Sequence, residues 1–178
     1  MAVRDALLGL LSLGPAYGLQ LHAELGTRAP HRAKTNVGQV YGTLDRLSTA
    51  GLVFHQGLTE DGLPLYALTD AGVAEATSWL SGQSLTALPE WADVQDVVLI
   101  SSSVDSNYST LLLDTLDSLL NAESIDSSVT PAQHLNHQAA LRYREAVSNW
   151  IEDVQAAVIQ PMPGYALGRP KRGRPAKG

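Results

Sequence analysis

The sequence predicts a mainly α-helical protein with one small β-hairpin and an all-helical C-terminal region. Three observations indicate this fold class. Apolar residues recur at steps of three and four along most of the chain, which is the spacing of one face of a helix. Two short β-prone runs interrupt this pattern at 52–56 and 65–68, and the turn signal Asp61-Gly62 lies between them. A hydrophobic content of 44% is that of a folded globular protein.

The predicted first domain, residues 1–82, consists of three helices, the hairpin and a fourth helix. Gly14-Pro15 closes the first helix, and Pro15 suits the first turn of the second helix, which Gly26 ends. Thr69 is placed to cap the fourth helix. The expected helices are 2–13, 15–25, 36–51 and 69–80. This order of elements is that of a winged helix-turn-helix domain, in which the third helix enters a DNA groove and the hairpin forms a wing.

The third helix begins and ends at recognisable residues. Asn36 can accept a hydrogen bond from the amide of Gln39 while the Gln39 side chain reaches back, which would form a capping box. Gly51 is expected to end the helix in a left-handed conformation. The apolar stripe of this helix consists of Val37, Val40, Leu44 and Leu47.

The face opposite this stripe is suited to contact DNA. Gly38 and Gly42 would let the backbone approach another surface closely, although each weakens the helix by about 1 kcal/mol relative to alanine. Gln39, Thr43 and Arg46 carry side chains able to read base edges in a major groove. We therefore interpret this segment as a recognition helix. The alternative is an ordinary amphipathic helix with a solvated polar face.

Residues 83–163 are predicted to form a helical region that makes a dimer. A linker containing serine, glycine and proline precedes three further amphipathic helices, expected at 90–100, 108–120 and 131–159. Helices with such apolar stripes more often serve packing and dimerisation than cofactor binding. We expect Arg142 and Arg144 to pair with Glu145 or Asp153 across the helix seam.

Three segments of the first domain resemble the signatures of PadR-type transcriptional regulators, in the same order and at similar separations. They are residues 8–18, 38–53 and 66–72. The resemblance implies a dimeric, ligand-responsive repressor whose C-terminal helices form the dimer. It places the DNA-contact positions of the family on Gln39, Tyr41, Thr43 and Arg46, with Tyr41 at a phosphate.

The sequence departs from this family pattern at two places. Gly42 stands where many relatives have proline, and the wing tip reads Thr59-Glu-Asp-Gly62. Acidic side chains are repelled by phosphates, so we expect little DNA contact from His55, Gln56 or Thr59. Together with the basic connection before the third helix, the predicted DNA-binding residues are Lys34, Thr35, Asn36, Gln39, Tyr41, Thr43 and Arg46.

Charge is distributed unevenly along the chain. The net charge is −6, yet residues 169–178 carry five basic side chains and no acidic one. Residues 164–178 are predicted to be a disordered basic tail, in which Arg172-Gly-Arg-Pro resembles an AT-hook. Gly173 would let the chain lie on the floor of an A·T-rich minor groove while the flanking arginines extend along it. The alternative is nonspecific attraction to phosphates. The predicted minor-groove residues are Arg169, Lys171, Arg172, Gly173, Arg174 and Lys177.

Trp79 and Trp91 are the candidate residues of an effector pocket. In a subgroup of the family that this sequence resembles, aromatic residues at the dimer interface stack with flat hydrophobic compounds. The resemblance therefore suggests a small aromatic effector. The alternative is that both tryptophans serve interface packing.

Other kinds of chemistry find no support in the sequence. The chain contains no cysteine and no Gly-rich phosphate loop, and His134 and His137 supply too few ligands for a metal site. Ser101-Ser-Ser103 lacks the glycines of a nucleophile elbow. We therefore expect no catalytic residues, no metal and no cofactor. The absence of a signal peptide or a long apolar run leads us to expect a cytoplasmic, nucleoid-associated protein.

These features predict a sequence-specific DNA-binding transcriptional regulator. As a ligand-responsive homodimeric repressor, it would read an inverted repeat in double-stranded DNA. The alternative is a protein-interaction adaptor built on a winged-helix scaffold. The acidic wing tip favours the adaptor, whereas the basic tail and the capped recognition helix favour DNA binding.

Overall fold

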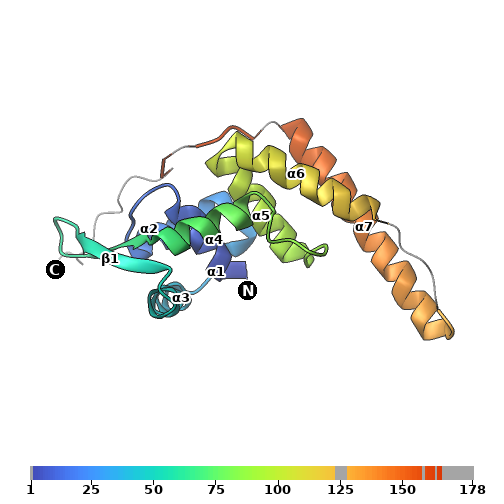
Figure 1. Ribbon diagram of the computed structural model, residues 1–178, viewed down its shortest axis with the longest axis horizontal. Helices are drawn as coiled ribbons and strands as arrows, with labels where there is room; N and C mark the ends of the chain where they lie inside the picture. Colours follow the sequence, from blue (N-terminus) through green and yellow to red (C-terminus); the bar gives the residue numbers. More distant parts are fainter. Residues whose placement is uncertain (1, 123–127, 158, 163, 166–178) are drawn as a thin grey trace, which may run out of the picture.

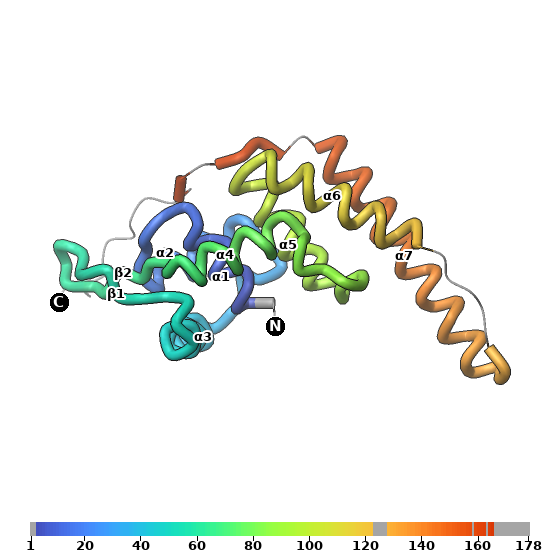
Figure 2. Tube along the Cα trace, in the orientation of Figure 1, coloured from blue at the N-terminus to red at the C-terminus, as the bar shows by residue number. Residues whose placement is uncertain are grey.

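The computed structural model of the chain describes residues 2–122, 128–157, 159–162 and 164–165. Helices dominate this part of the chain, and its one sheet is a two-stranded antiparallel hairpin, which confirms the predicted fold class (Figures 1 and 2). In chain order the elements are α1 (Ala2–Leu11), α2 (Gly18–Arg28), the 3-10 helix η1 (Pro30–Arg32), α3 (Val37–Thr49), β1 (Val53–Leu58), β2 (Pro64–Leu68), α4 (Asp70–Leu80), α5 (Trp91–Val104), α6 (Ser106–Asn121) and α7 (Pro131–Ala157).

The first apolar core lies between α1, α2, α3, α4 and the hairpin. α1 is at its centre and contacts each of the other three helices. The largest fully buried side chains of this core include Leu7, Leu10, Leu21, Leu44 and Leu80. Burial of each leucine contributes about 1.5–3 kcal/mol, so this core is the main source of stability for the arrangement that presents α3.

The connection between α1 and α2 differs from the sequence expectation. α2 begins at Gly18 rather than at Pro15, because Ala16 is paired with Tyr66 of β2. Two backbone hydrogen bonds of 3.0 and 2.9 Å join these residues. The turn between the first two helices is thereby fixed to the inner strand of the wing.

The start of α4 lies directly against the start of β1. The Thr69 hydroxyl donates to the Gly51 carbonyl at 2.7 Å and accepts from the Gly72 amide at 3.1 Å, which confirms the predicted cap. A Cβ atom at residue 72 would lie 2.0 Å from the Leu52 carbonyl oxygen, so this contact requires glycine. Gly51 itself has φ 71°, as predicted for the residue that ends α3.

A second apolar cluster joins α5, α6 and α7. Its buried members are Val94, Val97, Val98, Leu112, Leu116, Val147, Ile151 and Val154. α5 also contributes Ile100 and Val104 to the first core, and Trp79 of α4 packs against both clusters. The winged domain and the helical region therefore share α5. A movement of this helix would change the packing of both apolar clusters.

Only one of the two arginines of α7 pairs with an expected partner. Arg142 bonds Glu145 at 2.9 Å on its own helix rather than across a seam. Arg144 instead donates to the carbonyls of Leu119 and Leu120 at 2.6 and 2.5 Å, at the end of α6. A cation at these carbonyls satisfies groups that the helix leaves without an intrahelical partner, and it complements the helix dipole.

The chain returns to the first domain after α7. The Met162 amide donates to the Ser103 carbonyl at 2.7 Å, and Tyr165 packs against the first apolar core. We expected the tail to begin at residue 164, but Gly164 and Tyr165 are in contact with the domain. The basic residues expected in the tail, from Arg169 onward, lie outside the described residues.

Candidate nucleic-acid interface

α3 is held at the surface of the first domain by its apolar stripe. Val40, Leu44 and Leu47 are fully buried against α1 and α2, whereas Val37 is half-buried. Figure 1 shows α3 on one side of the domain, next to the hairpin. One long face of the helix is thereby left toward solvent.

The cap of α3 is simpler than the predicted capping box. The Asn36 side chain accepts a hydrogen bond from the Gly38 amide at 2.7 Å. The Gln39 amide donates instead to the main-chain carbonyl of Asn36 at 2.9 Å. The Asn36 cap is thus confirmed, but its partner is one residue earlier than expected. Gln39 remains exposed on the outer face.

The predicted DNA-binding residues divide into three groups by burial. Thr35 and Tyr41 are half-buried, and Thr43 is buried. The exposed members are Lys34, Asn36, Gln39 and Arg46. A side chain must be accessible to reach a base edge, so Gln39 and Arg46 are the readers that this conformation offers.

Thr43 holds Arg46 instead of facing solvent. The Thr43 hydroxyl donates to the Gln39 carbonyl at 2.7 Å and accepts from Nη2 of Arg46 at 2.8 Å. With only 4% of its surface exposed, Thr43 has no free edge for a base in this conformation. We assign it the task of orienting the arginine, which the spacing of three residues on a helix allows.

Tyr41 lies over the start of α2. A Cβ atom at residue 18 would lie 2.5 Å from Cε1 of the Tyr41 ring, so glycine is required beneath the ring. This contact explains the glycine at the end of the first signature segment. It fixes the half-buried phenol at the junction of α2 and α3.

An ion-pair cluster holds the segment that precedes α3. Asp96 of α5, whose side chain is 1% exposed, receives Arg32 Nη2 at 2.7 Å and His31 Nε2 at 2.8 Å. Arg32 Nε adds contacts of 3.0 and 3.1 Å to the two carboxylate oxygens. We call these three residues the Asp96 cluster. It connects the helical region to η1, five residues before the recognition helix begins.

Sequence reasoning missed the Asp96 cluster. Asp96 stands in an apolar stretch of α5, 64 residues from Arg32. The available signal was Asp96 itself, a charged residue in a helix whose other residues are mostly buried. Because buried charges are nearly always paired, it predicted a cationic partner.

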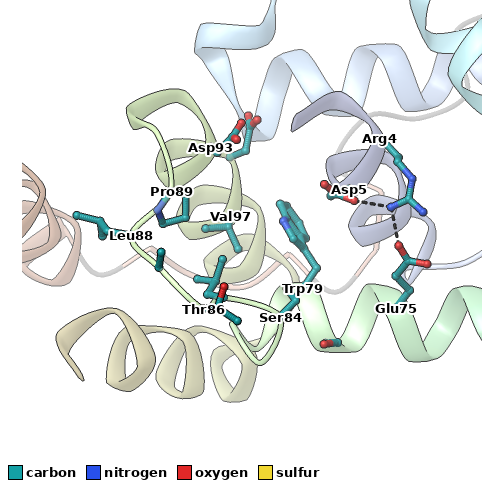
Figure 3. Close-up of a pocket in the computed structure, with 14 residues that line it drawn as sticks. Arg4, Asp5, Glu75, Trp79, Ser84, Thr86, Leu88, Pro89, Asp93 and Val97 are labelled. Carbon is teal, nitrogen blue, oxygen red and sulfur yellow. Dashed lines mark hydrogen bonds and ion pairs between the residues drawn. The ribbon is translucent and has the colours of Figure 1, made fainter. Parts of the chain in front are cut away.

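A cavity of about 630 Å³ opens between α1, α4, α5 and the loop after α4 (Figure 3). Trp79 and Val97 line it together with an apolar loop. Gly9 of α1 makes room for the indole, because a Cβ atom there would lie 2.8 Å from the ring. The loop residues of the lining are Ser84, Leu85, Thr86, Ala87, Leu88 and Pro89.

The charged side chains of this cavity are mostly acidic. Its lining includes Asp5, Glu75, Asp93 and Asp96, against one cation, Arg4. Arg4 bonds Asp5 at 2.7 Å and Glu75 at 2.5 Å (Figure 3). Burial raises the pKa of Asp5 above its ordinary value despite this pairing. The cavity therefore favours cationic or neutral molecules over anions.

The two predicted pocket tryptophans are not brought together. Trp79 lines the cavity, whereas Trp91 packs against Trp150 at a ring distance of 5.5 Å and against Tyr143 at 6.5 Å. Trp91 thus belongs to the contact between α5 and α7. The part of the chain that the structure describes holds no group of three His, Cys, Asp or Glu suited to a metal ion. Among the same residues, no helix combines the length and apolar character needed to cross a bilayer.

Comparison with known proteins finds a similarity for the first domain. Residues 7–78 match the family described as "Transcriptional regulator PadR-like family". Among solved structures, Bacillus subtilis PadR in complex with operator DNA is similar at 21% identity, with 89% of this chain and 99% of that chain covered and a TM-score of 0.44. The same protein in complex with p-coumaric acid gives 23% identity, the same coverage of 89% and 99%, and a TM-score of 0.42. Comparison with curated proteins gave no match. Over residues 7–78 the chain is therefore similar to the transcriptional regulator PadR-like family.

Proposed function

We propose that the protein is a sequence-specific DNA-binding transcriptional regulator that acts as a repressor. The carrying observation is the outer face of α3, where Gln39 and Arg46 are exposed on a capped helix whose other outward positions include two glycines. In the major groove, Arg46 suits guanine and Gln39 suits adenine. Tyr41 and Lys34 would contact phosphates near the start of this helix. Because the proposed function is DNA binding, we expect the protein to be associated with the nucleoid.

We further propose a homodimer formed through α7. The first half of this helix extends beyond α6 (Figure 1), and it exposes 68% of Leu135 and 37% of Leu141. Such apolar side chains on a projecting helix suit a second copy of the chain. A two-fold dimer would place its recognition helices in successive major grooves, about 34 Å apart, and would read an inverted repeat.

The cavity beside Trp79 is the proposed effector site. Its volume of about 630 Å³ suits a small molecule, and the indole suits a flat aromatic one. The acidic lining favours an effector that also carries a positive charge, which Trp79 would stabilise further. Such a cation would compete with Arg32 for Asp96. The segment before α3 would then loosen, and the population would shift away from the DNA-binding arrangement.

Selection of bound fragments from random duplexes tests the function directly. We expect the purified protein to enrich an inverted repeat with half-sites about one helical turn apart. Arg46→Ala should cost about 1–3 kcal/mol of binding and relax the preference at one position of each half-site. Thr110→Ala, at an exposed position of α6, is the control and should leave the enriched motif unchanged. Recovery of no motif would exclude the proposed function.

A protein-interaction adaptor is the second candidate, and the acidic wing tip favours it. Glu60 and Asp61 are exposed at the end of the hairpin, where phosphates would repel them. Glu60→Gln combined with Asp61→Asn distinguishes the two functions. If the wing faces DNA, this change should raise affinity for a selected duplex severalfold at low salt. Weaker capture of a protein partner, with DNA binding absent before and after the change, would favour the adaptor.

A further inference from the structure

We propose that the chain after α7 fixes one end of the joint between the winged domain and the helical region, so that this joint opens only at its other end, beside the cavity. The segment concerned consists of residues 159–162, 164 and 165, and we call it the return segment. The inference deepens the regulation proposed for the cavity and rests on that proposed function. It identifies the fixed point about which the winged domain would turn.

Two arginines attach the winged domain to one face of α5. Arg28, the last residue of α2, bonds Ser103, and Arg32 of η1 bonds Asp96. Asp96 and Ser103 are seven residues apart, so they lie on the same side of α5, two turns or about 10 Å from each other. The two attachments therefore mark the two ends of the joint.

The packing around α5 differs between these two ends. Towards its C-terminal end, Ile100 and Val104 belong to the first apolar core. The Ser101 hydroxyl also donates to the Leu80 carbonyl of α4 at 2.8 Å. At Asp96, by contrast, α5 lines the cavity of about 630 Å³ that separates it from α1 and α4. The joint is therefore packed at the C-terminal end of α5 and hollow beside Asp96.

The arginine at the packed end is fully enclosed. The Arg28 side chain has no exposed surface, and its Nε donates to the Glu24 carboxylate at 2.9 Å. Nη1 donates to the Ser103 carbonyl and hydroxyl at 2.8 and 3.0 Å. Nη2 donates to the carbonyls of Met162 and Gly164 at 3.2 and 2.5 Å. These acceptors match the full donor capacity of a guanidinium.

The return segment bridges the two sides of the joint at this end. Figures 1 and 2 show the chain running back from the end of α7 toward the winged domain. On the helical side, the Met162 amide donates to the Ser103 carbonyl at 2.7 Å. On the winged side, the Tyr165 ring packs against the first apolar core, and its hydroxyl donates to the Gly14 carbonyl in the turn after α1. Separation of α2 from α5 would break bonds of the return segment as well as those between Arg28 and Ser103, so it is costly.

The arginine at the hollow end is held less completely. The Arg32 side chain is 22% exposed, and it donates hydrogen bonds of 2.7, 3.0 and 3.1 Å to one carboxylate, that of Asp96. Asp96 also lines the cavity, where a bound molecule can reach it. Release of Arg32 would let the winged domain turn about Ser103. The domain would carry α3 with it, because α3 is packed in the first apolar core.

The test uses the full chain, which contains no cysteine, so a single introduced thiol reports on a single site. Val97→Cys places a buried thiol beside the cavity, and Ser101→Cys places one at the packed end. The two positions are four residues apart on α5 and hence on one face of the helix. The rate at which dithionitrobenzoate modifies each thiol under native conditions measures how often that end of the joint opens.

The first variant releases the hollow end. Asp96→Asn should speed the reaction at position 97 on the order of tenfold and leave the reaction at position 101 unchanged. Asp93→Asn is the matched control, since Asp93 is 41% exposed and 3.9 Å from Arg32, and it should change neither rate. Equal acceleration at both positions would show that the joint has no fixed end, which overturns the inference.

The second pair of variants releases the packed end. Tyr165→Ala removes the attachment of the return segment to the winged domain, and should speed the reaction at position 101 on the order of tenfold. Arg28→Lys keeps a charge beside Glu24 but lacks the fork that bonds Ser103 and the return segment together, so it should act in the same direction. Tyr165→Phe keeps the ring and should retain most of the protection.

A matched tyrosine distinguishes this effect from a general loss of stability. Tyr143 is also half-buried, and its hydroxyl donates to the Pro89 carbonyl at 2.5 Å. Tyr143→Ala should lower the melting temperature without changing the rate at position 101. If Tyr165→Ala does the same, or if both variants speed the reaction equally, the return segment does not fix the joint and the inference is wrong.

A selected operator separates this inference from the function on which it rests. Because DNA binding and opening of the joint are linked, the operator should slow the reaction at position 97 severalfold, whereas a scrambled duplex should not. If neither duplex is preferred, the DNA-binding function fails, and the rates without DNA still decide whether the joint has a fixed end. If the operator is preferred but leaves the rate at position 97 unchanged, DNA binding stands and only the inference is overturned.

Discussion

Gly18 lies directly beneath the phenol ring of Tyr41, and this contact sets the junction of α2 and α3. Gly18→Ala would bring a Cβ atom to 2.5 Å from the ring. We expect it to lower the free energy of unfolding by about 1–3 kcal/mol, as overpacking of a tight contact does. Urea denaturation measures the change. The double variant Gly18→Ala/Tyr41→Ala removes the clash, so its loss should be smaller than the sum of the single losses.

Asp5 at the wall of the cavity gives a pH-dependent effect. Burial raises its pKa in the folded protein, so the folded state binds the proton more tightly than the unfolded state. The stability that this proton provides is present below the unfolded pKa and is lost as the pH rises through the folded pKa. Asp5→Asn should therefore raise the melting temperature at pH 7, and this advantage should disappear below about pH 4. Asp114→Asn, at an exposed position of α6, should show no such difference.

Sequence reasoning placed Gln39 and Arg46 correctly on the exposed face of α3 but misjudged the burial of Thr43. The helical spacing placed Gln39 and Arg46 outward, because apolar periodicity determines which side of a helix is buried. The same spacing put Thr43 near the outer face, yet it is buried and bonded to Arg46. Thr43 lies at the edge of the apolar stripe, where burial depends on the neighbouring helices rather than on the period.

At the level of the elements, adding a side chain to the outer face of α3 should have opposite effects on protein stability and on DNA binding. The nearest atom to a Cβ at residue 42 is Arg46 Nη1, at 3.8 Å, so alanine fits there. Gly42→Ala should stabilise the helix by about 1 kcal/mol. It should nevertheless weaken binding to a selected operator, because the added methyl group lies where the backbone approaches the duplex.

Thermal denaturation and fluorescence anisotropy measure the two effects of this substitution. The rise in stability serves as the internal control, since weaker binding by a more stable protein cannot result from unfolding. Unchanged affinity would mean that this face does not approach DNA closely. It would then favour the solvated amphipathic helix that the sequence left as an alternative.

Element types were predictable because each has a local cause, but several boundaries depend on distant residues. Asn36, Gly51 and Thr69 act at the helix ends where sequence reasoning placed them. The start of α2 moved because Ala16 pairs with Tyr66, fifty residues away in the sequence. No local pattern around Pro15 predicts that pairing, because its partner lies in the hairpin.

In the molecule as a whole, contacts over long sequence distances connect the helical region to the DNA-binding domain. The Asp96 cluster joins α5 to η1, and Arg28 joins α2 to both Ser103 and Gly164. The charged residues Asp96 and Arg28 are visible in the sequence, but their bonding partners are not. Pairings between residues 64 to 136 positions apart are decided by tertiary packing, so spacing rules cannot identify them.

Asp96→Asn tests whether the first of these connections supports the recognition helix. The substitution keeps the shape of the side chain but replaces one acceptor oxygen with a donor that faces Arg32 or His31. It should lower the free energy of unfolding by about 1–3 kcal/mol. Because η1 leads into α3, affinity for a selected operator should fall as well. Asp93→Asn is the control, since Asp93 is 41% exposed and 3.9 Å from Arg32, and its effect should stay below about 0.5 kcal/mol.

Comparison of the two measurements decides what the Asp96 cluster does. If operator affinity falls by more than the loss of folded protein explains, the cluster positions the segment before α3 for binding. If stability falls while the affinity of the folded fraction is unchanged, the cluster only joins the two regions. In that case a ligand that displaced Arg32 from Asp96 could not release the DNA, and the proposed link between the cavity and the recognition helix would have to be abandoned.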